Sequence, residues 1–326
     1  MKKGRNLRSV NTDGGVNLQF KLLSAIGIII IVSGHCYHGG MELAYNWFPP
    51  YSYNLALFVF ISGYFYKTDY EENVGKYIWK RTKRLLIPAY LWNIFYGCMV
   101  AFLGLFGFTI GAKPDLYNLF VMPFVDGEAF QYNLGSWFVY PLFLVCIINV
   151  LFRKFLKLIH LDNEFIVLIV YLAIGMIGIN TALENPTAIN VIVKLLVRTM
   201  FFLPCYEFGR FYKAVLEKKD NLNNVAYFAI IFAVQLILLT FCKDLEYTPS
   251  SFTKFNNGFI IPYISSITAI AFWLRVSRLL VPAIGNSKLV RLIADNTYGI
   301  MVNQLVGFMC LKFVFYLSLI HISEPT

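Results

Sequence analysis

Charged residues are scarce in this sequence, and their scarcity excludes an ordinary soluble domain. Only 14% of the 326 residues are Asp, Glu, Lys or Arg, whereas 58% are hydrophobic and 17% are aromatic. The mean hydropathy of +0.61 is typical of a chain that crosses a membrane several times. Nine membrane spans of about 20 residues each would use about 180 residues, which leaves no room for a large soluble domain.

The sequence also lacks closely spaced cysteine pairs and a basic region confined to one part of the chain. The six cysteines form no Cys-x-x-Cys pair, so the sequence indicates neither a disulfide framework nor a zinc site, and we expect no bound metal. The net charge of +10 is spread between apolar segments, whereas nucleic-acid-binding proteins gather positive charge on one face of a soluble fold. We therefore expect no nucleic-acid partner.

Nine continuous apolar runs predict an all-α fold, a polytopic transmembrane bundle of about nine or ten membrane helices. We expect these helices near residues 18–37, 51–66, 85–111, 134–152, 163–182, 195–212, 225–242, 257–274 and 296–317. The second segment is short and the third is long, so tilt or a break is expected in both. The sequence contains no internal repeat and no low-complexity linker.

Basic residues alternate between the two sides of the predicted helices. Of the 28 Lys and Arg residues, 21 lie in the N-terminal tail and in every second loop, or at the borders of these regions. Only four lie in the loops between them. Because short basic loops resist translocation, we predict that the N-terminal tail, residues 1–17, is cytoplasmic. The first apolar segment lacks a cleavage site and is expected to remain as an anchor.

The last nine residues, 318–326, are expected to be foreign to the natural protein. Their sequence, SLIHISEPT, resembles translated sequencing-adaptor read-through, so it carries no functional argument. We then expect the transmembrane domain over residues 18–317, in a natural chain that continues beyond it toward an even number of helices. The alternative is an ordinary short polar tail.

His35 is the first candidate for chemistry. It lies at the expected outer end of the first apolar segment, in the sequence IVSGH (31–35). An ionisable side chain in a membrane segment is costly and is therefore a functional candidate, and imidazole suits proton transfer near neutral pH. The alternative is a neutral, hydrogen-bonded histidine at the membrane interface.

Lys21 and Ser24 lie on the same predicted helix face as His35. At about 100° per residue they fall within about 40° and 20° of it, and Lys21 is about 21 Å away along the helix axis. Lys21 and His35 therefore cannot touch, but they could bind opposite ends of one long ligand. The alternative for Lys21 is a snorkelling anchor at the inner membrane surface.

A dense basic cluster precedes Pro88 in a loop expected on the inner side. The cluster includes Arg81 and Arg84, and arginine offers fixed donors that suit phosphate groups, such as those of a nucleotide-derived donor. The alternative is the positive-inside signal together with attraction to anionic membrane lipid, which is an expected partner in either case.

Acidic residues give weaker candidates. Asp126 and Glu128, in a loop expected outside, could orient His35 or bind acceptor hydroxyl groups, although exposed acids in loops usually contact only water. Glu207 and Asp295 could simply pair with arginines.

Several of these residues belong to motifs that occur in a recognisable order along the chain. The motifs are IVSGH (31–35), FVFISGY (58–64), Lys80-Arg81-x-x-Arg84-x-x-x-Pro88, Gly135-Ser136-Trp137-Phe138 and Tyr298-Gly299-Ile300-Met301. In their order and placement the chain resembles the acyltransferase 3 family of integral-membrane acyltransferases, many of which O-acetylate bacterial surface polysaccharides. The resemblance spans about residues 18–310.

The resemblance implies an O-acyltransferase of the bacterial inner membrane. Acetyl-CoA or another acyl-CoA would bind from the cytoplasm as co-substrate, near Arg81, Arg84 and Lys21. His35 would act as general base or transient acyl carrier toward a hydroxyl of a surface polysaccharide or lipid-linked glycan. Substrate-binding residues would come from the same motifs and from the last segment: Trp137, Gln304 and Ser62.

The sequence departs from the family pattern at two positions. Ser24 stands where the family often has arginine, and Gln304 stands where many members have histidine. Two other functions therefore stay open. One is a transporter or flippase of a lipid-linked sugar or small metabolite, with polar residues along a path, and the other is a scaffold or sensor with a degenerate site.

Overall fold

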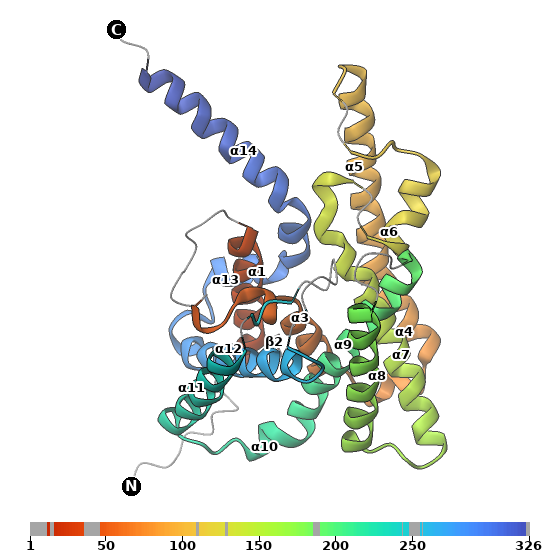
Figure 1. The fold of residues 1–326 in the computed structure, drawn as a ribbon, viewed down its shortest axis with the longest axis vertical. Coiled ribbons are helices and arrows are strands. Elements are labelled where there is room, and N and C mark those ends of the chain that lie inside the picture. Colours follow the sequence, from red (N-terminus) through yellow and green to blue (C-terminus); the bar gives the residue numbers. More distant parts are fainter. Residues whose placement is uncertain are drawn as a thin grey trace.

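The fold is all-α, as predicted. The computed structural model describes residues 12–13, 16–35, 46–108, 111–127, 130–184, 190–242, 244–247, 255 and 257–323, and Figure 1 shows them almost entirely as helices. Within these ranges the strands are two short ones, β1 (Thr12–Asp13) and β2 (Val16–Asn17), which pair antiparallel just before the first helix.

The helices follow one another with short connections. In chain order they are α1 Leu18–His35, α3 Asn54–Tyr64, α4 Val74–Arg81, α5 Ile87–Leu105, α6 Met122–Val125, α7 Val139–Leu158, α8 Glu164–Glu184, α9 Val191–Phe211, α10 Glu217–Lys219, α11 Asn224–Phe241, α12 Ile261–Ile284, α13 Lys288–Asp295 and α14 Thr297–Ser323. The 3₁₀ turns are η1 Pro50–Ser52, η2 Thr68–Glu71 and η5 Gln131–Phe138, and the π-helical turns are η3 Thr82–Leu86, η4 Tyr117–Val121 and η6 Tyr212–Leu216.

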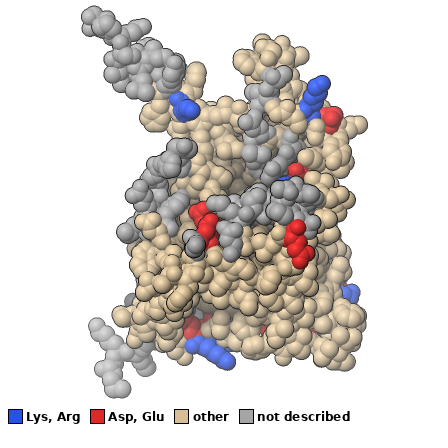
Figure 2. Space-filling model, in the orientation of Figure 1, with Lys and Arg blue, Asp and Glu red and all other residues tan. Residues whose placement is uncertain are grey.

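The chain is a multi-pass membrane protein. Seven helical segments in the described ranges are long and apolar enough to cross a membrane: Leu18–His35, Val74–Leu105, Gly135–Leu158, Glu164–Glu184, Asn224–Phe241, Ile261–Ile284 and Thr297–Phe315. On the face drawn in Figure 2, uncharged residues cover most of the surface and charged ones appear in only a few places. Such a surface suits contact with lipid.

Each of the nine predicted segments contains a helix, but two of these helices differ in kind from a simple membrane span. α3 has only 11 residues and is about 16 Å long, too short to cross a hydrocarbon core of about 30 Å. α9 carries four charged side chains, Lys194, Arg198, Glu207 and Arg210. Both helices are largely buried by protein, which explains how these features are tolerated.

A π-helical turn lies at the start of the third predicted segment. Helix α4, η3 and α5 run as one segment of 32 residues, Val74–Leu105, and η3 overlaps the predicted segment, 85–111, only at its first two residues, after which α5 is continuous. The tilt or break expected inside this segment therefore stays a prediction. Pro88 follows η3 by two residues, and because it lacks a backbone N–H, it leaves one carbonyl group of the preceding turn without its helical partner. Arg84 lies in the π turn and Arg81 just before it, so the turn changes the angle between these two side chains.

Helix α9 lies at the centre of the bundle, packed against α3, α7 and α8. Its backbone comes very close to that of α3, which Figure 1 shows between α1 and α9. A Cβ atom added at Gly63 would lie 1.9 Å from the Tyr206 carbonyl oxygen, and one added at Gly209 would lie 1.9 Å from the Phe60 carbonyl oxygen. Only glycine fits at these two positions, as at close helix contacts in other membrane proteins.

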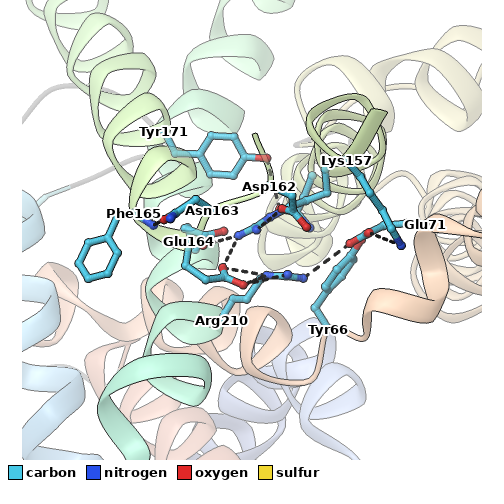
Figure 3. A network of polar contacts seen from close by, with 12 residues as sticks. Tyr66, Glu71, Lys157, Asp162, Asn163, Glu164, Phe165, Tyr171 and Arg210 are labelled. Atoms are coloured by element: carbon cyan, nitrogen blue, oxygen red, sulfur yellow. Dashed lines mark hydrogen bonds and ion pairs between the residues drawn. The ribbon is translucent and has the colours of Figure 1, made fainter. Parts of the chain in front are cut away.

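A network of ion pairs joins the ends of α7, α8 and α9 to η2 (Figure 3). The Arg153 guanidinium is fully buried and donates to Glu207 Oε1 at 2.6 Å and to Asp162 Oδ1 at 2.8 Å. Arg210 donates to Glu164 at 3.0 Å and lies 3.9 Å from Glu71. Glu207 thus pairs with an arginine, as the sequence suggested, and the charges of α9 are balanced inside the protein.

Candidate active site

His35 is the last residue of α1, and its side chain is exposed. The Tyr51 hydroxyl donates a hydrogen bond to the Gly34 carbonyl at 3.0 Å, which fixes the end of the helix. The Tyr51 ring also meets the His35 ring edge to face, with centroids 6.2 Å apart. No hydrogen bond to the His35 imidazole is made within the described part of the chain, so both ring nitrogens are available to a ligand.

His35 lines a small cavity together with two other predicted site residues. The cavity has a volume of about 90 Å³, and Trp137 and Gln304 form part of its wall. Its remaining lining comes from α1, α3, η5, α14 and the loops beside them: Ile31, Tyr51, Asn54, Leu55, Gly135, Phe138, Tyr247 and Met301. We call it the His35 cavity.

One buried polar atom in the wall of the His35 cavity lacks a partner among the described residues. The Gln304 Oε1 atom is buried without a hydrogen bond to any of them. The Tyr247 hydroxyl lies beside the Ser265 hydroxyl, and burial raises the pKa of Tyr247, so this hydroxyl stays protonated and can act as a donor. Because buried polar groups in proteins are normally hydrogen-bonded, the Gln304 oxygen indicates a polar ligand.

Trp137 is held from three sides. The Arg198 guanidinium lies over its ring at 4.5 Å from the centroid, and Phe202 stacks at 6.4 Å. Gly127, with φ of +80°, packs so closely that an added Cβ atom would lie 2.2 Å from the Trp137 Cα. The indole is therefore fixed as a rigid wall of the His35 cavity.

A second cavity lies next to the first and contains Arg84. It has a volume of about 150 Å³, and its lining includes Arg84, Tyr298, Phe138 and Met301. The Tyr298 hydroxyl is buried without a partner among the described residues, and no described residue pairs with the exposed Arg84 guanidinium. We call it the Arg84 cavity.

The two cavities share part of their walls. Phe138 and Met301 line both of them, so the His35 cavity and the Arg84 cavity lie on either side of this pair. Along α1, Ile28 lines the Arg84 cavity and His35 lines the other. These residues are seven apart, so they lie on one helix face about 10 Å from each other.

Lys21 continues the same face of α1 toward its N-terminal end but lies outside both cavities. It forms an ion pair with Asp295 and is within electrostatic range of Arg84 and Arg291. Asp295 thus pairs with a lysine rather than with an arginine. Together Lys21, Arg84 and Arg291 give the end of the Arg84 cavity a positive charge.

Two other predicted site residues lie elsewhere. Arg81 points at Tyr77, with its Nε donating to the hydroxyl at 3.0 Å and its guanidinium over the ring at 5.1 Å. Ser62 Oγ lies 3.9 Å from the sulfur of the buried Cys146. Neither residue lines the His35 cavity or the Arg84 cavity, so their predicted binding roles stay predictions without support from their surroundings.

Asp126, one of the acidic candidates in the loop expected outside, has partners other than His35. Asp126 pairs with Lys194 at 2.5 Å, and its carbonyl oxygen accepts a hydrogen bond from Arg198 at 2.7 Å. Glu128 lies outside the described residues. Within the described ranges no group of three His, Cys, Asp or Glu side chains could hold a metal ion.

Sequence reasoning missed four residues of this site. Asn54 and Arg198 each interrupt an apolar segment, a signal that could have identified them. Arg291 lies in a basic loop among similar residues, and Tyr247 lies in a polar loop, so nothing in the local pattern distinguishes either one. Only the fold brings Tyr247 beside His35.

Comparison with known proteins shows the family of the chain. The acyltransferase 3 family model, described as an acyltransferase domain, matches residues 17–323. No curated protein and no solved structure matches the chain.

Proposed function

The chain belongs to the acyltransferase 3 family of membrane proteins, and on this premise we propose that it transfers an acyl group, most simply acetyl, from cytoplasmic acyl-CoA to a carbohydrate hydroxyl on the opposite side. The acceptor is a surface polysaccharide or a lipid-linked glycan. The proposed location is the bacterial inner membrane, with the N-terminus in the cytoplasm.

One observation carries this proposal: a basic cavity and a histidine cavity adjoin through Phe138 and Met301. Acyl-CoA has a phosphorylated end and a reactive thioester at the end of a long arm. A site for it needs cations at one end and an acid–base group at the other, far enough apart for the arm. Arg84, from η3, and His35, from the end of α1, supply these groups.

The Arg84 cavity, where the proposal places the phosphates of acyl-CoA, suits a polyanion. Arg84 has no described partner, and the charges of Lys21 and Arg291 reinforce it. Phosphate oxygens accept strong charge-assisted hydrogen bonds from guanidinium groups. The partnerless Tyr298 hydroxyl is a donor for the amide groups of the pantetheine arm.

The acceptor end supports general-base catalysis. His35 would take the proton of the sugar hydroxyl while the hydroxyl oxygen attacks the carbonyl carbon of the thioester. A C–O bond then forms and the C–S bond breaks. The leaving thiolate of CoA would then accept the proton from the imidazolium. The Gln304 amide and the Tyr247 hydroxyl can bind the acceptor hydroxyls, and the rigid indole of Trp137 offers a surface for a sugar ring.

The size of the His35 cavity favours a short acyl group. A volume of about 90 Å³ has room for an acetyl group and one hydroxyl but not for a fatty acyl chain.

The proposal is tested by acyl transfer from radiolabelled acetyl-CoA in inverted membrane vesicles that contain a glycan acceptor. We expect label to enter glycan material with the natural chain and to be lost with His35→Ala. The matched control is His160→Asn, because His160 lies in the loop between α7 and α8 with a positive φ that asparagine tolerates. This variant should keep full activity.

Equal labelling by the natural chain and His35→Ala, at matched amounts of folded protein, would contradict the catalytic role of His35. Movement of a labelled glycan across the membrane without any acyl-CoA would instead support a transporter.

A further inference from the structure

A third cavity lies away from His35 and is larger than the two that form the candidate active site. Its volume is about 420 Å³, within the range of about 300–1,000 Å³ that is typical of small-molecule sites. It lies between α8 and α9 on one side and α11 and α12 on the other, and all but two of its lining residues are apolar or aromatic. Phe60, Phe208, Ile270 and Leu274 form part of this wall.

The two charged lining residues are neighbours at one end of the cavity. Lys219 and Asp220 follow η6, in a loop that the basic-residue pattern places on the cytoplasmic side. Asp220 binds two arginines of α12, Arg275 at 2.5 Å and Arg278 at 2.8 Å. We call this end of the cavity the basic mouth. Among the described residues it holds the three cations Lys219, Arg275 and Arg278 against Asp220 and the nearby Glu217, which lies within electrostatic range of the lining residue Tyr212.

The basic mouth has positive charge left over for a ligand. Lys219 makes no ion pair with any described residue, and the Arg278 side chain keeps 23% of its surface exposed although it shares Asp220 with Arg275. An apolar cavity that ends in excess positive charge at the membrane surface matches an amphipathic anion. The anionic lipids of the cytoplasmic leaflet have this chemistry.

We propose that this cavity binds an anionic phospholipid, with one acyl chain between α9 and α12 and the phosphate at the basic mouth. Asp220 holds Arg278 in place, and Lys219 supplies the charge that no described residue neutralises. The bound lipid fills the space between the two helix pairs. This site is separate from the proposed acyl transfer and does not depend on it.

The test is lipid retention by the full-length protein. The protein is reconstituted in phosphatidylcholine with a small fraction of phosphatidylglycerol and is then extracted in mild detergent. Native mass spectrometry measures which lipids stay bound to it. We expect one phosphatidylglycerol to be retained in preference to phosphatidylcholine. Lys219→Gln should lower this preference about fivefold, the factor that corresponds to about 1 kcal/mol per basic residue near an anionic lipid, whereas Lys218→Gln, a neighbour outside the lining, should not change it.

A second pair of variants tests the apolar part of the lipid-binding cavity. Ala271→Trp fills the cavity, because Ala271 lines it, and should abolish retention of the lipid. Ala233→Trp, on an exposed position of α11, should keep it. Retention in proportion to bilayer composition by the natural chain, or an unchanged preference in both Lys219→Gln and Ala271→Trp, would overturn the proposal. Lys219→Gln alters only an exposed side chain, so this test does not depend on the folding of Ala271→Trp.

Discussion

Arg84 and Arg81 are three residues apart, yet the structure gives them different surroundings. Arg84 lines a cavity and has no described partner, whereas Arg81 is bound to Tyr77. We expect Arg84→Gln to raise the KM for acyl-CoA at least tenfold, because a hydrogen bond to a charged group contributes about 1.5–3 kcal/mol. Initial rates over a range of acyl-CoA concentrations in inverted vesicles measure this effect.

Two neighbouring variants serve as controls for Arg84. Lys83→Gln removes an exposed charge that lies over the Trp79 ring and should leave the KM unchanged. Arg81→Gln should lower the melting temperature rather than raise the KM. A rise in KM that is equal in Arg84→Gln and Lys83→Gln would mean that only the general charge of the surface matters.

Tyr247 offers a test of the acceptor end. Its hydroxyl makes no well-formed hydrogen bond to a described residue and lies beside the Ser265 hydroxyl, so Tyr247→Phe should change the melting temperature little. The loss of one neutral hydrogen bond to the acceptor should slow acyl transfer about two- to tenfold. Rates at saturating acyl-CoA, together with thermal unfolding in detergent, separate the two effects.

Tyr263→Phe should behave in the opposite way. The Tyr263 hydroxyl donates to the Phe201 carbonyl at 3.3 Å inside the core, far from any proposed substrate. This variant should lose stability and keep its transfer rate per folded molecule. If Tyr247→Phe instead lost stability without losing rate, the hydroxyl would belong to the fold and not to the acceptor site.

The site residues divide into those that a motif marks and those that only the fold reveals. His35, Arg84 and Trp137, which the sequence names as candidates, line the two cavities, because a charged or aromatic side chain at a fixed place in a motif is visible in the sequence; their roles stay predictions. Ser62 lies in a motif as well, but the rotation of α3 directs it toward Cys146. The direction of a side chain depends on helix packing, which a linear pattern does not contain.

At the scale of helices, the buried ion network of Figure 3 makes a specific prediction. Arg153→Met would leave the carboxylate of Glu207 buried without its partner. Breaking a buried pair in this way costs about 3–5 kcal/mol, so we expect a marked fall in the melting temperature and in the yield of folded protein. Thermal unfolding followed by size-exclusion chromatography measures both.

The adjacent residue Lys154 provides the control. It lies on the exposed side of α7, so Lys154→Met should change the melting temperature little. Glu207→Gln should cost less than Arg153→Met, because a neutral amide replaces the buried charge. An Arg153→Met variant as stable as the natural chain would show that the network does not hold the helix ends together.

Apolar runs in the sequence predicted where the helices lie, because a membrane helix must bury its backbone polar groups over about 20 residues. The same reasoning could not predict the character of α3 and α9. The short α3 is tolerated because it packs between α1 and α9, and the four charges of α9 are tolerated because they have partners on other segments. Such long-range pairing leaves no periodic signal along the chain.

For the whole molecule, the distribution of basic residues predicts which loops face the cytoplasm. Lys218→Cys, in the loop before α11, should react with an impermeant maleimide only in inverted vesicles. Lys113→Cys, in the loop after α5, should react in intact cells. Both tests need a background in which the six natural cysteines are replaced, and labelling of both positions from one side would refute the predicted orientation.

Under the proposed function, the two residues that line both cavities would also have to insulate the membrane. An acyl transfer of the proposed kind opens the protein to substrates from both sides, and an unbroken column of water would let protons leak down the membrane potential, worth about 2.3 kcal/mol per charge per 100 mV. Phe138 and Met301 are apolar and only 5% and 7% exposed. Apolar constrictions exclude water, so we expect this pair to block a proton leak during transfer and to protect the proton gradient of the cell.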